Sequence, residues 1–146
     1  MSEHPTLALR SALLWCVVPA LVLAVLQAAV AGMAWPSADR VWPGIVSMLV
    51  AQAVLLVGAA ACVVGFVRLS RTTEPEAALR GTASALAPLP WILLGLLVAT
   101  ALAWLVIDAN AAIGAVVFGL VGAQAWFALT AARRSLLRGL AASSGA

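Results

Sequence analysis

The sequence predicts an all-α integral membrane protein: a four-transmembrane-helix bundle made of two antiparallel helical hairpins, with the N and C termini both cytoplasmic. Composition is the first observation. Of the 146 residues, 65% are hydrophobic and only 9% are charged, and the mean hydropathy is +1.14. A soluble domain of this length needs far more polar side chains to cover its surface. Residues 1–146 are therefore expected to form a single membrane domain.

Four long apolar runs are the second observation. Each run extends for about 20 residues without an internal charge, which is the length that crosses about 30 Å of hydrocarbon at 1.5 Å per residue. Pro36, Pro43 and Asn110 indicate turns after the first and third runs, and such short connections favour antiparallel neighbours. The expected spans are residues 11–35, 44–67, 88–107 and 111–132.

The distribution of arginine predicts the orientation. All eight basic residues are Arg, and only Arg40 falls between the first and second spans. The others flank the opposite ends of the spans, and basic residues there favour the cytoplasmic side. We expect the N-terminal segment, the loop 68–87 and the tail 133–146 to be cytoplasmic. Abundant Arg, Ala and Gly without Lys indicate a GC-rich genome, so the expected location is the inner membrane of a bacterium.

A cleavable signal sequence is the alternative interpretation of the first run. Residues 29–32 read AVAG and supply the small side chains that a cleavage site requires. However, the run is longer than a usual signal core, and Glu3 precedes it together with Arg10. A retained first span is therefore preferred.

The stretch RLSRTTEPEAALR, residues 68–80, holds five of the thirteen charged side chains. Within it, TEPE predicts the start of a short surface helix, with Thr73 as N-cap, Pro75 in the first turn and an end near Arg80. The charges are interpreted either as a topology signal of the long cytoplasmic connection or as a docking site for a partner. The residues concerned are Arg68, Arg71, Glu74, Glu76 and Arg80.

Polar groups inside the spans are few and uncharged. Proton relays, ion-coupled transport and haem ligation normally need ionisable side chains at membrane depth, so we expect no catalytic, metal or cofactor site. Cys16 and Cys62 lie in apolar runs and are interpreted as packing residues, with a redox pair as the alternative. The remaining polar side chains form a possible intramembrane cluster, acting as interhelical hydrogen bonds or as a ligand pocket. They are Gln27, Gln52, Thr100 and Gln124.

Small residues recur every four positions in several spans. Such stripes allow close helix approach, either inside the bundle or at a surface for another copy or partner. The triplet ALR at 8–10 occurs again at 78–80. This repeat suggests the hypothesis that the two halves, each with two spans, arose by duplication, and the sequence does not decide it. The stripes include Cys16 to Gly32 in the first span, Gly95, Ala99 and Ala103 in the third, and Ala111 to Ala123 in the fourth.

The predicted function is that of a small non-enzymatic, multi-pass membrane protein, an accessory or assembly subunit of a larger bacterial envelope complex. No catalytic constellation is visible in the sequence. The expected partners are membrane lipids and either a larger membrane protein or further copies of the chain, without nucleic acid. The alternative function is a small oligomeric transporter, channel or lipid-binding membrane protein.

Overall fold

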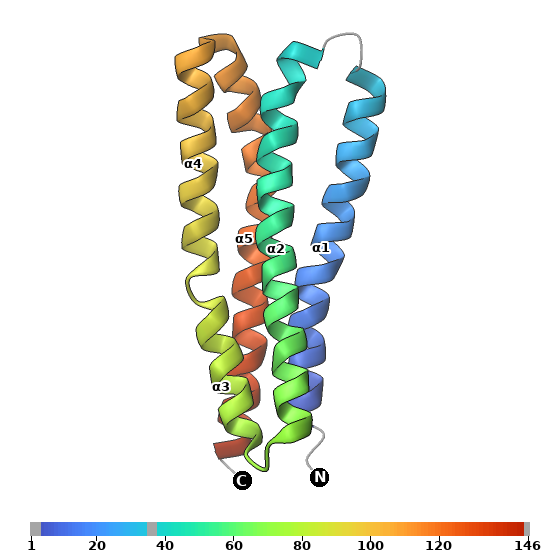
Figure 1. The fold of residues 1–146 in the computed structure, drawn as a ribbon, viewed down its shortest axis with the longest axis vertical. Helices are drawn as coiled ribbons and strands as arrows, with labels where there is room; N and C mark the ends of the chain where they lie inside the picture. Colours follow the sequence, from blue (N-terminus) through green and yellow to red (C-terminus); the bar gives the residue numbers. More distant parts are fainter. Residues whose placement is uncertain (1–3, 35–37, 145–146) are drawn as a thin grey trace.

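The computed structural model describes residues 4–34 and 38–144, and nearly all of them are helical. The chain alternates direction from one long helix to the next, so α1 begins and α5 ends at the same end of the bundle (Figure 1). We call this the terminal end and the other the distal end. The helices are α1 His4–Ala34, α2 Ala38–Arg71, α3 Pro75–Leu86, α4 Leu89–Ile107 and α5 Ala109–Ser144.

Four segments are long and apolar enough to cross a membrane, which confirms the number of spans expected from the sequence. Each of them overlaps one of the predicted spans, because their length and composition depend on the same apolar runs. The third combines α3 and α4, with a short break between the two helices. The segments are Pro5–Met33, Trp42–Arg71, Pro75–Ile107 and Ala109–Ser144.

Several helix boundaries differ from the sequence prediction. The second helix begins at Ala38 rather than at residue 44 and contains Pro43. Most of the predicted loop 68–87 is helical, because Arg68 to Arg71 end α2 and α3 follows after a short connection. The predicted tail 133–146 continues α5 as far as Ser144. The charged residues show where the apolar run ends, but the helix continues beyond them. It continues because residues such as Leu136 are still buried against neighbouring helices.

The short helix predicted after the second span is present as α3, but its ends differ from the prediction and one of its faces is packed. It begins at Pro75 with Glu74 as N-cap, which makes no side-chain capping hydrogen bond, rather than with Thr73. It ends at Leu86 rather than near Arg80. One face packs against α2 and α5. That face buries Ala78, Leu79, Thr82, Ala83 and Leu86.

The break between α3 and α4 follows from proline chemistry. Pro88 precedes α4 and Pro90 lies at its start. Proline lacks a backbone N–H and suits a first helical turn, where that donor would have no partner in the helix. The chain therefore ends one helix and begins another at this point instead of continuing as a single rod.

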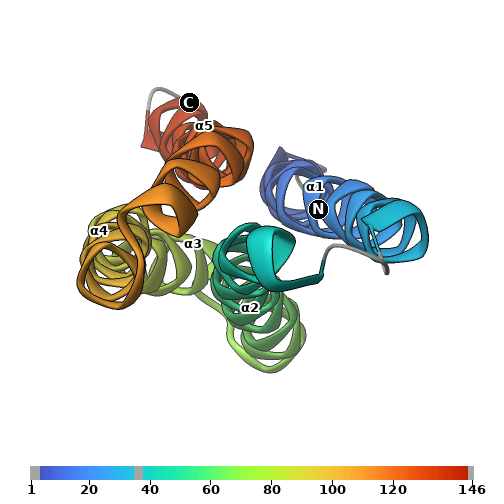
Figure 2. The ribbon, with the colours of Figure 1, turned by 90° about the horizontal axis from the view of Figure 1, so that it is seen from above.

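The two central helices of the bundle are α2 and α5, which contact each other and every other helix. Figure 2 shows α1 and α4 on opposite sides of this central pair. Within the described residues, α1 and α4 make no contact with each other. The helices α2 and α5 therefore separate α1 from α4, and each of them contacts both outer helices.

The core follows a seven-residue pattern that is most regular in α2. Its buried positions are separated alternately by four and three residues, the spacing of a left-handed helix seam. The same period appears in α1 at Leu9, Cys16 and Leu23. In α2 the buried positions of the seam are Gly44, Met48, Ala51, Leu55, Gly58, Cys62 and Gly65.

Glycine in the α2 seam allows unusually close packing. A Cβ atom at Gly58 would lie 3.0 Å from Leu129 Cδ2, 3.2 Å from Cys16 Sγ and 3.4 Å from Leu86 Cδ2. Four helices therefore meet at this one residue. At Gly65 an added Cβ would overlap Thr82 of α3. In lipid, where little hydrophobic force acts between helices, such close contact is a main source of helix association.

We predict that Gly58→Leu destabilises the bundle by about 1–3 kcal/mol or more, because overpacking forces neighbouring side chains and backbone to move. Gly95→Leu is the matched control, since no atom lies within 4 Å of a Cβ at Gly95. Thermal unfolding in one detergent measures both variants. Equal melting temperatures for the two variants would contradict the packing described at Gly58.

Candidate functional site

The four polar side chains of the predicted intramembrane cluster are not brought together. Gln52 Nε2 donates a hydrogen bond to the Ala20 carbonyl oxygen at 3.4 Å, which links α2 to α1. Thr100 Oγ1 donates to Leu96 O, 2.8 Å away in its own helix. Gln124 lies exposed on α5. Because α1 and α4 do not touch within the described residues, Gln27 and Thr100 cannot meet.

Gln27 has a different environment from Gln52. Its Nε2 atom is buried and has no hydrogen-bond partner among the residues that the structure describes. A buried donor without a partner loses its hydration and gains nothing in return. The interhelical hydrogen bond expected from this group of residues is therefore found for Gln52 and not for Gln27.

The charged residues of 68–80 lie around the connection between α2 and α3. Arg68, Arg71, Glu74 and Arg80 are exposed, and Glu76 is half-buried. The guanidinium of Arg68 reaches towards α3, with its Nη1 atom 3.4 Å from where a Cβ at Gly81 would lie. Their role as a topology signal or as a docking site stays a prediction.

The two cysteines meet in the core between α1 and α2. Cys16 and Cys62 are fully buried, and their side chains are close neighbours. Both are free thiols. No cluster of three or more metal-ligating His, Cys, Asp or Glu side chains occurs in residues 4–34 and 38–144. Cys62 is the next buried position after Gly58 in the α2 seam, and Cys16 of α1 packs beside both.

A groove runs along the surface between α1 and α5, and we call it the α1/α5 groove. It consists of two adjoining cavities of about 250 and 280 Å³, which share Trp15 and Phe127 as lining residues. The remaining lining residues are Val18, Pro19 and Val22 of α1 and Gln124, Ala128, Thr130, Ala131, Arg134, Ser135 and Arg138 of α5.

Polarity changes along the α1/α5 groove. Arg134 and Arg138 line the part nearer the terminal end, whereas Val18 and Val22 line the part nearer the middle of the bundle. At the polar part, Ser11 Oγ and Ser135 Oγ share a hydrogen bond of 3.3 Å across the two helices. The groove therefore offers cationic groups at one end and an apolar trough at the other.

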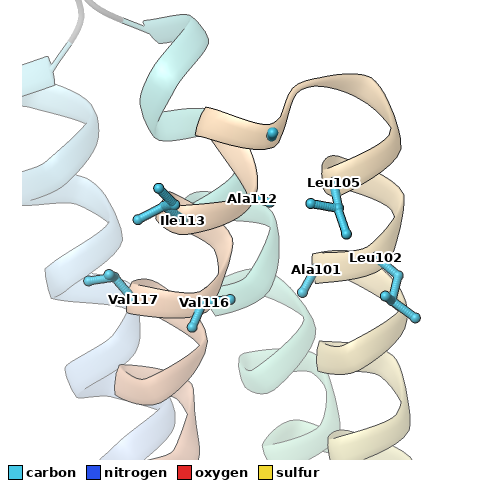
Figure 3. A pocket seen from close by; sticks show the side chains of 8 residues that line it. Ala101, Leu102, Leu105, Ala112, Ile113, Val116 and Val117 are labelled. Atoms are coloured by element: carbon cyan, nitrogen blue, oxygen red, sulfur yellow. The ribbon is translucent and has the colours of Figure 1, made fainter.

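A second groove, between α4 and α5, is apolar throughout. It has a volume of about 380 Å³ and lies near the distal end, where Figure 3 shows Leu105 and Ala101 of α4 facing Ala112 and Val116 of α5. Ligand sites usually include a few polar groups that orient the bound molecule. This groove has none among its lining side chains, which are Ala101, Leu102, Leu105, Ala109, Ala112, Ile113, Val116 and Val117.

Helix α4 exposes its small residues instead of burying them. Gly95, Ala99 and Ala103 all lie on the surface, and we call them the α4 face. The buried residues of α4 come only from its first turns and are Leu89, Pro90 and Leu93. In contrast, the stripes of α1 and α5 begin in the core, at Cys16 and Ala20 and at Ala111 and Ala115.

No protein-family model, no curated protein and no solved structure matches this chain. Its function is therefore inferred from the chemistry of the α1/α5 groove and the α4 face.

The residues of the α1/α5 groove were not predicted from the sequence. The C-terminal arginines were used only to predict on which side of the membrane the tail lies. A helical-face pattern could have found them. Gln124, Phe127, Ala131, Arg134 and Arg138 are separated alternately by three and four residues, so they share one face of α5. The neighbouring Arg133 does not line the groove.

We predict different effects of removing the amide groups of Gln52 and Gln27. Gln52→Leu should lower the free energy of unfolding by about 0.6 kcal/mol, the average for interhelical hydrogen bonds in membranes. Gln27→Leu should be neutral or stabilising, because it removes a buried donor without a partner. Chemical unfolding in mixed micelles measures both variants. A larger loss for Gln27→Leu than for Gln52→Leu would contradict these environments.

We also predict that Ser11→Cys combined with Ser135→Cys forms an intramolecular disulfide on mild oxidation, because the two hydroxyl oxygens lie 3.3 Å apart. Cys16→Ala and Cys62→Ala remove the native thiols from this background. The control pairs Ser11→Cys with Ser144→Cys, nine residues further along α5. Peptide mapping by mass spectrometry identifies the bond, and equal cross-linking of both pairs would refute the α1–α5 register.

Proposed function

We propose that this chain is a non-enzymatic subunit that assembles laterally with another membrane protein through the α4 face. It would act as an accessory or assembly subunit of a larger complex in the inner membrane of a bacterium. The observation that supports this proposal is the exposure of Gly95, Ala99 and Ala103 on the helix that contributes least to the core.

The physical argument rests on what small residues do in lipid. Helices associate there when their backbones approach closely, and Gly or Ala at four-residue spacing permits that approach. A helix that only faces lipid gains nothing from Gly95, which lowers helix propensity by about 1 kcal/mol relative to Ala. A second helix packed on the α4 face would use this residue in the way that the core uses Gly58.

The orientation and the two-hairpin arrangement belong to the same proposal. The N-terminal segment, the α2–α3 connection and the C-terminal part of α5 all lie at the terminal end (Figure 1). Exposed arginines lie on or near these segments, namely Arg10, Arg68, Arg80, Arg134 and Arg138. Placing the terminal end in the cytoplasm satisfies the preference of basic residues for that side.

The alternative is a small oligomeric transporter, channel or lipid-binding protein. An oligomer of identical chains would use the same α4 face. The two proposed functions are therefore distinguished by the protein that binds this face, either a different membrane protein or another copy of the chain. Of the three activities, lipid binding is favoured by a specific observation, the graded polarity of the α1/α5 groove.

We predict that the chain purified in mild detergent is found by native mass spectrometry in an assembly with a second membrane protein. Gly95→Leu with Ala99→Leu should reduce that assembly about tenfold, equivalent to about 1.4 kcal/mol, because two large side chains prevent close approach. A Cβ at Gly95 would have open space, and Ala99 is exposed, so both positions lie outside the core of the monomer.

The matched control is Ala28→Leu with Gly32→Leu, two exposed small residues at the same spacing on α1. This pair should leave the assembly unchanged. A wild-type chain that is monomeric in several mild detergents, or an assembly lost in the α1 pair and kept in the α4 pair, would refute the proposal. A closed assembly of identical chains would favour the alternative function.

A further inference from the structure

We propose that the α1/α5 groove binds one anionic phospholipid, with its phosphate held by Arg134 and Arg138 and an acyl chain lying along Val18 and Val22. This site goes beyond lateral assembly, because α4 contributes no residue to it. The argument rests on charge, on the position of the polar groups and on the shape of the apolar part.

The charge of the groove is positive and uncompensated. Arg134 and Arg138 are exposed, line the same cavity and form no hydrogen bond or ion pair with another residue of the described chain. No Asp or Glu is among the residues lining the groove. Like charges four residues apart on a helix repel each other. An anion between them removes that repulsion, and guanidinium groups bind phosphate oxygens by charge-assisted hydrogen bonds.

Further polar groups surround the same position. Thr130 and Ser135 line the cavity with the arginines, although their hydroxyls already donate to carbonyl oxygens of their own helix. The Thr130 oxygen remains able to accept a hydrogen bond from a headgroup hydroxyl. Ser135 Oγ already accepts one from Ser11 Oγ and keeps a second lone pair for the same purpose. Trp15 is 48% exposed beside them, and indole prefers the boundary between headgroups and hydrocarbon. This part of the groove thus has the character of the headgroup region.

The apolar part continues from Trp15 and Phe127 towards the middle of the bundle. Val18, Pro19 and Val22 form one wall and Ala128 forms part of the other. The small Ala128, 2% exposed, leaves room between the larger side chains. A chain of methylene groups fits such a trough, and its headgroup would then reach the arginines. A water-soluble phosphate would use only the polar part.

The occupant that matches both parts is a lipid with a net negative headgroup. A zwitterionic headgroup brings its own cation to two arginines and gains less from them. Basic pockets between membrane helices on the cytoplasmic side are known to bind anionic headgroups. The two arginines of the groove thus combine a topological role with a binding role, whereas Arg133 outside the groove has only the first.

The test measures lipid binding to the full chain in detergent by native mass spectrometry, with dioleoyl phosphatidylglycerol and dioleoyl phosphatidylcholine as probes. The expected result is preferential retention of phosphatidylglycerol. Arg134→Gln with Arg138→Gln should weaken it by about fivefold for each arginine removed. Arg71→Gln with Arg133→Gln is the matched control, because it removes two exposed charges outside the groove and should change binding little.

The apolar part is tested by filling it. Val18→Trp places a large side chain in the groove, and Val25→Trp places the same side chain at an exposed position of α1 that does not line it. Val18→Trp should reduce phosphatidylglycerol binding several-fold, and Val25→Trp should not.

Three results would overturn the inference. They are equal retention of the two lipids by the wild type, an equal loss in the groove and control arginine pairs, and displacement of the lipid by glycerol 3-phosphate at equal concentration. The last would assign the site to a free phosphate. Because the readout is lipid bound to one chain, its failure is distinguishable from failure of assembly through α4.

Discussion

The close approach of helices along α2 is the constraint on which the rest of this structure depends. Small residues at Gly44, Ala51, Gly58 and Gly65 lie seven residues apart and are all buried. In lipid they replace the hydrophobic driving force that holds a soluble bundle together, because dispersion contacts grow only when backbones come close. At Gly58 the neighbours come from three other helices. Larger side chains at these positions would separate α2 from all of them at once.

That constraint also decides which surfaces remain for function. Since α2 and α5 form the centre, α1 and α4 lie at opposite edges of the bundle (Figure 2). Many residues of these two helices are exposed. The edge between α1 and α5 carries arginine beside an apolar trough, which suits a lipid with a charged headgroup. The α4 edge carries small apolar residues, which suit another helix. The two edges therefore differ in chemistry as well as in position.

Apolar run length was enough to predict the four spans, because crossing a bilayer sets a length that few other structures need. Packing was harder to predict. A search for recurrence every four residues found Cys16 to Gly32 but missed the seven-residue seam of α2. On a helix of 3.6 residues per turn, a four-residue step turns by about 40° and a seven-residue step by about −20°. The α1 stripe consequently starts buried at Cys16 and Ala20 and ends exposed at Ala28 and Gly32. Gln27, Gln52, Thr100 and Gln124 were grouped because they are the polar side chains within the apolar runs, and that does not state the direction in which a side chain points.

The same rotation distinguishes the α4 face from the exposed end of the α1 stripe. The α1 stripe begins in the core, and its rotation around the helix brings Ala28 and Gly32 to the surface. Packing in the core therefore explains the small residues at the start of this stripe. Gly95 and Ala103 are only eight positions apart, over which their stripe turns by about 80°, and its first member, Gly95, is already exposed. All three residues of this stripe are exposed, and a Cβ at Gly95 would have open space. Packing within the chain therefore gives no reason for their small size. A helix from another protein, approaching as closely as α5 approaches α2, would supply one.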